Sequence, residues 1–141
     1  MRQIVLALSF ALFSATSANA IECLNGQSGD ILSLESWQLL DGESDSEKTL
    51  SISLHHAGPV GIRLIDATVR FQDVLGERIG EFPLERADGI DPQADYSFSH
   101  VVAGTILERL ENLHPDDIEG IACVRALVYE DGTLKDFADQ G

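Results

Sequence analysis

The sequence contains few cations, little sulfur and few aromatic residues. Its 141 residues include one Met, two Cys and one Trp, and nine Lys and Arg oppose 24 Asp and Glu, which gives a formal net charge of −15. Such an acidic chain is repelled by nucleic acid and by anionic lipid, because both carry negative charge. Since the single methionine is Met1, a copper site elsewhere in the chain would lack thioether ligands.

Long apolar runs are also absent, apart from one at the N-terminus. Residues 4–13 are apolar except for Ser9, and a small-x-small cleavage pattern ends at Ala20. This arrangement is typical of a secretory signal, and the run is shorter than the ~20 residues that a membrane-spanning helix needs. We therefore expect cleavage after Ala20 to remove residues 1–20. Residues 21–141 would then form a single exported domain, periplasmic or secreted, without a membrane span.

The two cysteines are Cys23 and Cys123. A lipid-anchored cysteine would follow a small residue, with a Leu-like residue three places before it, but Glu22 and Ala20 hold those positions. A redox-active pair is usually spaced C-x-x-C, which the sequence lacks. Because cysteines in exported chains usually pair, we expect a structural Cys23–Cys123 disulfide rather than a lipid anchor or a reactive thiol.

Hydrophobicity in the exported part alternates more than it follows a helical period. Residues 50–54 (LSISL) and 65–71 (IDATVRF) put apolar side chains on one face and mostly polar ones on the other, which is typical of half-buried strands. Turn residues follow at Gly76 and at Asp131-Gly132. These segments predict antiparallel strands joined by short hairpins.

Three further strands are expected at residues 30–40, 94–101 and 120–129. The first has a broken alternation that a β-bulge or an edge position would explain. Turn signals recur about every ten residues along the chain, as in known sandwiches. We therefore predict a mainly β fold in which about seven or eight strands form two antiparallel sheets packed face to face.

One segment, residues 105–113 (TILERLENL), predicts a short α-helix. The apolar residues at helical spacing are Ile106, Leu107, Leu110 and Leu113. Thr105 and Glu108 have the spacing of a capping box, and Pro115 would stop the helix. Because so short a helix is not stable alone, we expect its apolar stripe to pack on a sheet.

A stretch of about fifty residues resembles a known family. The segment SISLHHAGPVGIRLIDATVRFQDVLGERI, followed by IDPQADYSF, resembles bacterial exported immunoglobulin-like domains of the FxLYD type. The likeness covers residues 51–98, with His56 in the place of the usual Asn and Gln93 in the place of a Gly. It implies an immunoglobulin-like sandwich, in a family whose members are mostly non-catalytic.

The most polar segment, residues 41–47 (DGESDSE), carries the candidate cation ligands Asp41, Glu43 and Asp45. Calcium takes six to eight oxygen ligands from flexible loops, so a calcium site is chemically reasonable there. The spacing of an EF-hand loop is absent, however. The alternative is a solvated hairpin tip with no bound ion, which the sequence favours.

The four histidines are His55, His56, His100 and His114. Neighbours such as His55 and His56 point to opposite faces of a strand, so they cannot share a metal ion there. The sequence also lacks the H-E-x-x-H and G-x-S-x-G patterns, a phosphate-binding loop and a dinucleotide fingerprint. We therefore expect no transition metal, no cofactor and no enzymatic activity.

These observations favour an exported, non-catalytic module that binds a basic protein or supports an envelope complex. The alternatives are a calcium-binding module that uses residues 41–47 and a small inhibitor or ligand carrier. A deep pocket at His100 or Trp37 would favour the carrier, whereas an apolar patch ringed by acidic residues would favour a protein partner. The sequence leaves the oligomeric state open.

Overall fold

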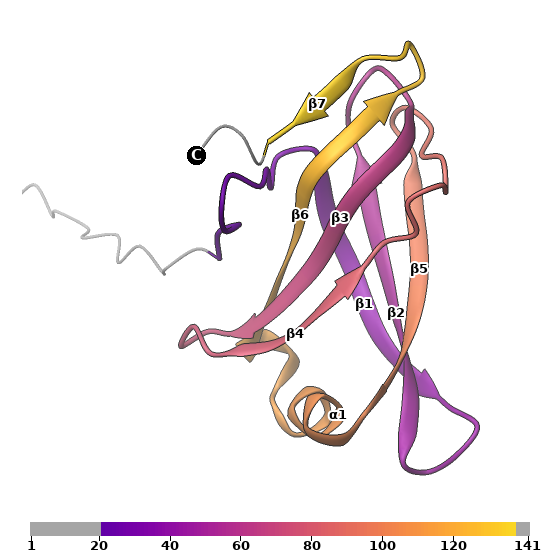
Figure 1. Ribbon diagram of the computed structural model, residues 1–141. Coiled ribbons are helices and arrows are strands. Elements are labelled where there is room, and N and C mark those ends of the chain that lie inside the picture. Colours follow the sequence, from indigo (N-terminus) through magenta and orange to yellow (C-terminus); the bar gives the residue numbers. More distant parts are fainter. Residues whose placement is uncertain (1–20, 138–141) are drawn as a thin grey trace, which may run out of the picture.

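Two antiparallel sheets pack face to face in the computed structural model, which describes residues 21–137 (Figure 1). One sheet has the strand order β1-β2-β5 and the other has the order β4-β3-β6-β7. The strands are β1 (Leu32–Asp41), β2 (Glu47–His56), β3 (Ile62–Asp73), β4 (Arg78–Pro83), β5 (Asp95–Ala103), β6 (Ile118–Tyr129) and β7 (Leu134–Asp136). The predicted β-sandwich is confirmed, while the predicted signal segment lies outside the described residues.

The core between the sheets is built from the alternating apolar residues of the sequence. In β2 the side chains of Leu50, Ile52 and Leu54 are fully buried, and the serines between them face outwards. In β3 the side chain of Phe71 is fully buried and contacts Trp37 and Phe82 edge to face, with ring centroids 5.7 and 5.8 Å apart. Burial of each such side chain contributes roughly 1.5–3 kcal/mol.

Close packing of the sheets depends on Gly120 in β6. A Cβ atom at this position would collide with Leu34 Cδ2 and would lie 2.9 Å from Phe71 Cε1. Leu34 reaches this point from β1 because a bulge between Leu34 and Ser36 sets the facing of that strand. The predicted bulge is therefore confirmed, and it lets both Leu34 and Trp37 pack against the core.

The N-terminal segment is attached to the edge of β6. The Cys23–Cys123 disulfide is present, with Cα atoms 5.6 Å apart. Ser28 and Val124 exchange two backbone hydrogen bonds, in which each N–H donates to the other's carbonyl oxygen, at 2.9 and 2.8 Å. The disulfide and the Ser28–Val124 bridge therefore together hold the segment before β1 to the sheet.

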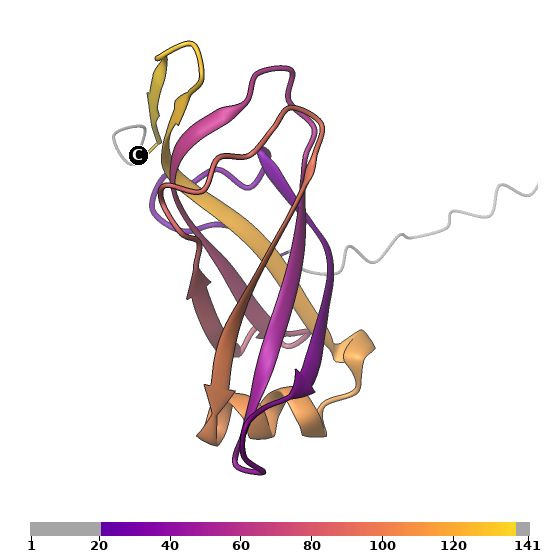
Figure 2. The same cartoon turned by 90° about the vertical axis from the view of Figure 1, so that its right-hand side faces the viewer.

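The helix α1 (Gly104–Asn112) crosses one end of the sandwich, followed by the short 3-10 helix η1 (Pro115–Asp117) (Figure 2). It contacts β2, β4 and β5 and buries Leu107 and Leu110. Within residues 21–137, no helix is long and apolar enough to cross a membrane. Burial of Leu107 and Leu110 confirms the helix with an apolar stripe that the sequence predicts near residues 105–113.

The predicted capping box is wrong. The N-cap residue is Ala103, and no side chain caps the helix. Gly104 has a φ of +61°, which lets the chain turn from β5 directly into the helix. Thr105 consequently lies inside the first turn, where its hydroxyl cannot act as an N-cap.

We expect Leu110→Ala to lower the free energy of unfolding by about 2–5 kcal/mol, because it leaves a cavity where α1 packs on the sheets. Leu110 is 3% exposed. Thr105→Ala is the matched control within the same helix and should change stability by less than about 0.5 kcal/mol. Urea unfolding of both variants tests this, and equal midpoints for them would show that the helix does not depend on its buried stripe.

Candidate functional site

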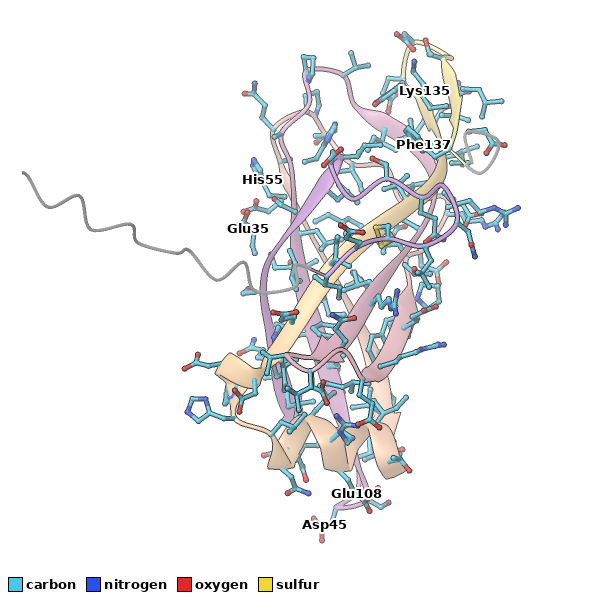
Figure 3. The ribbon with its side chains drawn as sticks, turned by 90° about the vertical axis from the view of Figure 1, so that its left-hand side faces the viewer. Glu35, Asp45, His55, Glu108, Lys135 and Phe137 are labelled. Atoms are coloured by element: carbon cyan, nitrogen blue, oxygen red, sulfur yellow. A yellow bond between two sulfur atoms is a disulfide. The ribbon has the colours of Figure 1, made fainter. Side chains whose placement is uncertain are left out.

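Six carboxylates gather at the end of the sandwich where α1 lies. We call this surface the acidic end, and it consists of Asp41, Glu43, Asp45, Glu47, Glu108 and Glu111. Asp41 ends β1, Glu43 and Asp45 lie in the β1–β2 connection, and Glu47 begins β2. Figure 3 shows Asp45 of this connection at the same end as Glu108 of α1. An ion pair of 2.9 Å between Lys48 Nζ and Glu111 Oε1 joins β2 to α1. Segments that are far apart in the sequence therefore form one surface.

The acidic end is open and strongly negative. The β1–β2 connection borders a hollow of about 420 Å³ that is lined by Asp41, Gly42, Ser44, Asp45, Glu47 and Lys48. Lys48 is the one cation in this lining. Its hydrogen bond and charge interaction with Glu111 raise the pKa of its ammonium group. The positive charge of Lys48 is thus already engaged, and the loop carboxylates remain available to an external cation.

The structure does not bring the predicted calcium ligands together. Asp41, Glu43 and Asp45 are exposed along the connection. Within residues 21–137, no three His, Cys, Asp or Glu side chains are grouped closely enough to hold a metal ion. Calcium needs several oxygen ligands that converge on one point. Carboxylates spread over a surface are instead suited to a partner that presents several positive charges.

The adjacent histidines face opposite sides of β2, as predicted. His55 lies on the outer face, where its Nδ1 is 2.7 Å from Asp95 Oδ1. His56 is buried, with Nε2 2.9 Å from the Val60 carbonyl oxygen, and the Gly58 N–H donates to its Nδ1 at 3.4 Å. Both nitrogens of His56 are therefore used to hold the β2–β3 loop.

His100 and Trp37 belong to the packing between the sheets. His100 Nε2 is 2.8 Å from the Pro83 carbonyl oxygen, and its ring lies between Phe82 and Phe98, with centroids 5.7 and 5.6 Å away. The fourth histidine, His114, accepts a hydrogen bond from the Asp116 N–H at the start of η1. These contacts give each of the three side chains a structural role.

A second surface, the apolar hollow, lies on the outer face of the four-stranded sheet. It has a volume of about 150 Å³ and is lined by Leu64, Ile65, Asp66, Arg86, Ala126, Leu127, Val128 and Leu134. Leu64 and Leu134 are 43% and 65% exposed. Asp66 Oδ2 lies 3.3 Å from Arg86 and 3.7 Å from Arg125 at the rim. The sequence pattern does not reveal this surface, because a bulge next to Leu64 decides which way that side chain points.

The tip of the β3–β4 hairpin is held by hydrogen bonds of Asp73 and carries two exposed apolar side chains. Asp73 Oδ1 accepts hydrogen bonds from the Leu75 and Glu77 N–H groups, both at 2.9 Å, and Arg109 donates to Asp73 Oδ2 at 2.7 Å. The Glu77 N–H, with the Leu75 N–H and Arg109, lowers the pKa of Asp73 below its ordinary 3.8, although burial opposes the shift. Leu75 is 92% exposed and Val74 is 45% exposed.

We expect Asp73→Asn to weaken the acid sensitivity of folding. Because the pKa of Asp73 is lower in the folded protein than in the unfolded chain, its stabilising effect is complete above the unfolded value near 3.8. The effect is lost as the pH falls through the lower, folded value. Urea unfolding between pH 2 and pH 6, roughly the range over which carboxylates titrate, should therefore show a steeper acid loss for the unsubstituted protein. Equal pH slopes for the two proteins would contradict the role of Asp73.

Comparisons with known proteins do not assign the chain to a family. No family model matches the chain, and no curated protein matches it. The X-ray structure of Northeast Structural Genomics Consortium target SoR45 is similar at 14% sequence identity with a TM-score of 0.40, over 77% of this chain and 81% of that one.

Proposed function

We propose that the protein is an exported, non-catalytic module that binds a basic protein partner, or supports an envelope complex, through its acidic end. The observation that carries this proposal is the meeting of the β1–β2 connection with α1. It places six carboxylates at one end of the sandwich, where the ammonium group of Lys48 is already paired with Glu111. Such a surface attracts a complementary positive patch and accelerates encounter with it.

Export is supported by two features of the chain. The Cys23–Cys123 disulfide is typical of proteins that fold in oxidising compartments. Residues 1–20 have the pattern of a secretory signal. Because that segment contains Arg2, its removal would make the exported chain one unit more negative than the −15 of the full sequence.

The test compares two triple variants of equal charge. In one, Asp41, Glu43 and Asp45 are replaced by Asn, Gln and Asn. In the matched control, three exposed carboxylates of other segments, Glu22, Asp30 and Asp91, are replaced by Gln, Asn and Asn. Proteins captured by crosslinking in the native compartment are identified by mass spectrometry. We expect basic partners to be lost from the first variant and retained by the control, and equal capture by both would refute the use of the acidic end.

Calcium binding at the same loop is the second candidate. It predicts a rise in melting temperature when calcium is added, because a ligand stabilises the state that binds it. The rise should vanish in the variant without Asp41, Glu43 and Asp45. Since these carboxylates do not converge, we expect no shift at all. A calcium shift that the substitutions abolish would replace the protein-binding proposal for this surface.

A further inference from the structure

We propose that the basic partner supplies an extended segment that pairs with the free edge of β5 and so adds a strand to the three-stranded sheet. This proposal rests on the proposed function, because it takes the partner to be the basic protein that the acidic end attracts. The segment has an apolar centre and positive charges at both ends. The acidic end holds one end of this segment, and β5 holds its backbone.

The backbone of β5 is free along one side. Its sheet has the strand order β1-β2-β5, so β5 has one strand neighbour, and its register with β2 shows no shift. The His56 N–H donates to the Ala94 carbonyl oxygen at 2.9 Å, which marks this pair as hydrogen-bonded. Hydrogen-bonded and non-hydrogen-bonded pairs alternate in an antiparallel ladder. The even-numbered residues of β5 therefore bond to β2, and the odd-numbered residues point their N–H and C=O groups to the free edge.

These free backbone groups are accessible. The odd-numbered residues of β5 are all exposed, namely Asp95, Ser97, Ser99, Val101 and Ala103. Within residues 21–137, no backbone hydrogen bond joins residues 95–101 to a segment other than β2. The edge of β5, labelled in Figure 1, therefore offers a row of unpaired donors and acceptors, which is what strand addition requires.

The other edge strands, β1, β4 and β7, carry features that oppose strand addition. β1 is interrupted by its bulge, where Glu35 is exposed. β4 includes Arg78, Glu81 and Pro83, and β7 has only 3 residues. Charges, proline, bulges and shortness are the usual protections of an edge. β5 has 9 residues without proline or bulge, and its charged residue is Asp95 at its start. It is thus the edge that this fold leaves open.

The side chains of β5 indicate what the centre of the added segment carries. The ring of Phe98 is half-buried, stacks on Tyr96 with centroids 5.9 Å apart, and meets His100 edge to face at 5.6 Å. On the opposite face of the strand, Ser97 and Ser99 are uncharged. An apolar side chain placed beside Phe98 covers the exposed part of its ring, and neighbours of this kind stabilise a sheet.

Carboxylates lie at the start of β5. Asp88 Oδ2 accepts a hydrogen bond from the Tyr96 hydroxyl at 2.9 Å. Burial, together with Asp88 and Glu85, raises the pKa of this hydroxyl to about 12. Arg86 lies between these two acidic residues in the sequence, but its guanidinium is 3.3 Å from Asp66 of β3. Negative charge therefore dominates around Tyr96.

Further charges leave this sign unchanged. Asp91 and Asp95 are exposed carboxylates, and His55 is the partner of Asp95 at 2.7 Å. Arg63, at the start of β3, is the other cation close in sequence to the segments that meet here. A positively charged segment end is thus attracted to the start of β5.

The other end of β5 leads into the acidic end. Ala103 lies opposite Glu47 and is followed by α1, which carries Glu108 and Glu111. Lys48 is the cation beside them and is paired with Glu111 at 2.9 Å. A second copy of this chain would bring the same carboxylates to the edge, and each copy carries a charge of −15. Because like charges repel, we assign the edge to the basic partner.

The first test uses the unsubstituted protein and two synthetic peptides. One is Lys-Lys-Val-Thr-Val-Thr-Val-Lys-Lys, and the other has the same sequence with N-methyl groups on its Val and Thr amides. Methylation removes backbone donors and keeps every charge. We expect the first peptide to bind in a titration at low salt and the methylated one to bind about tenfold more weakly or worse, because hydrogen bonds to the edge are lost.

Ser99→Pro tests the same edge from the side of the protein. Because Ser99 points its N–H outwards, proline breaks no hydrogen bond to β2, and edge strands tolerate proline. It removes a donor and obstructs an added strand, so we expect binding of the unmethylated peptide to weaken by about tenfold or more. Ser99→Ala is the matched control, because it keeps the N–H group and should leave binding unchanged. A melting curve verifies that Ser99→Pro is folded, and the methylated peptide gives a test that does not depend on this variant.

Amide hydrogen exchange locates the contact. In the free protein the Ser97, Ser99 and Val101 amides should exchange quickly, whereas the Phe98 amide, which is bonded to β2, should be protected. Binding of the unmethylated peptide should protect the odd-numbered amides as well. If those amides become protected in the free protein as its concentration rises, a second copy occupies the edge and the proposal is wrong.

The variant in which Asn, Gln and Asn replace Asp41, Glu43 and Asp45 separates this proposal from the function on which it rests. If this variant loses the peptide while methylation and Ser99→Pro change nothing, charge alone holds the partner and strand addition is overturned. If methylation and Ser99→Pro abolish binding but the charge variant binds normally, strand addition stands and the acidic end is not the attraction. Absence of binding by the unmethylated peptide, or equal binding of both peptides, would also contradict strand addition.

Discussion

Replacing Cys23 and Cys123 together by serine is expected to lower the free energy of unfolding by about 2–5 kcal/mol. The bond joins residues separated by 100 positions. For a loop of that length, loss of entropy in the unfolded chain alone corresponds to roughly 4.7 kcal/mol. The bond also holds the segment that leads to β1 against the edge of β6, where Ser28 and Val124 form the remaining backbone bridge. We therefore expect this segment to detach first.

Urea unfolding with and without a reducing agent measures this effect. The unsubstituted protein should lose stability when reduced, and the double serine variant should be unaffected, which makes it the control for side effects of the reductant. Hydrogen exchange should accelerate at the Ser28 and Val124 N–H groups before it does in β3. If reduction leaves the unfolding midpoint unchanged, the disulfide is not a main source of stability.

Phe71→Ala is expected to lower the free energy of unfolding by about 3–5 kcal/mol. The side chain of Phe71 is fully buried and lies between Trp37 and Phe82 in the centre of the sandwich. Its removal leaves a cavity between the two sheets, because the strands on either side are fixed by their hydrogen bonds and cannot close the gap. The substitution also removes the ring that packs over Gly120.

The matched control for Phe71→Ala is Leu75→Ala. Leu75 follows the same strand but is 92% exposed, so its truncation should change stability by less than about 0.5 kcal/mol. Denaturant unfolding of both variants at one pH compares the two losses in the free energy of unfolding. Equal losses for the two variants would mean that the aromatic contacts of Phe71 do not organise the core.

The sequence predicts much of the fold where local rules apply. Alternation in residues 50–54 and 65–71 corresponds to the buried faces of β2 and β3, because a strand exposes its side chains with a period of two. Gly76 and Gly132 have φ values of +91° and +87° at the predicted turns. The number of cysteines and the predicted export signal together predict their pairing.

The remaining features depend on long-range packing that no local pattern encodes. The capping box at Thr105 has the correct spacing, but Gly104 starts the helix one residue earlier by a backbone conformation that spacing cannot reveal. Leu64 reaches the outer face through a bulge between β3 and β6. The carboxylates of residues 41–47 meet α1 only because β1, β2 and β5 share one sheet. The acidic loop and the helix could therefore each be found from the sequence, but their proximity could not.

The central claim is that the acidic end binds a basic partner by charge. It is tested most directly by measuring partner capture by the purified protein at 0.1 M and at 1 M salt, between which the Debye length falls from ~10 Å to ~3 Å. We predict strong capture of basic proteins at low salt and its loss at high salt, with the variant lacking Asp41, Glu43 and Asp45 showing little capture at either. Capture that ignores salt, or partners that are themselves acidic, would contradict the claim.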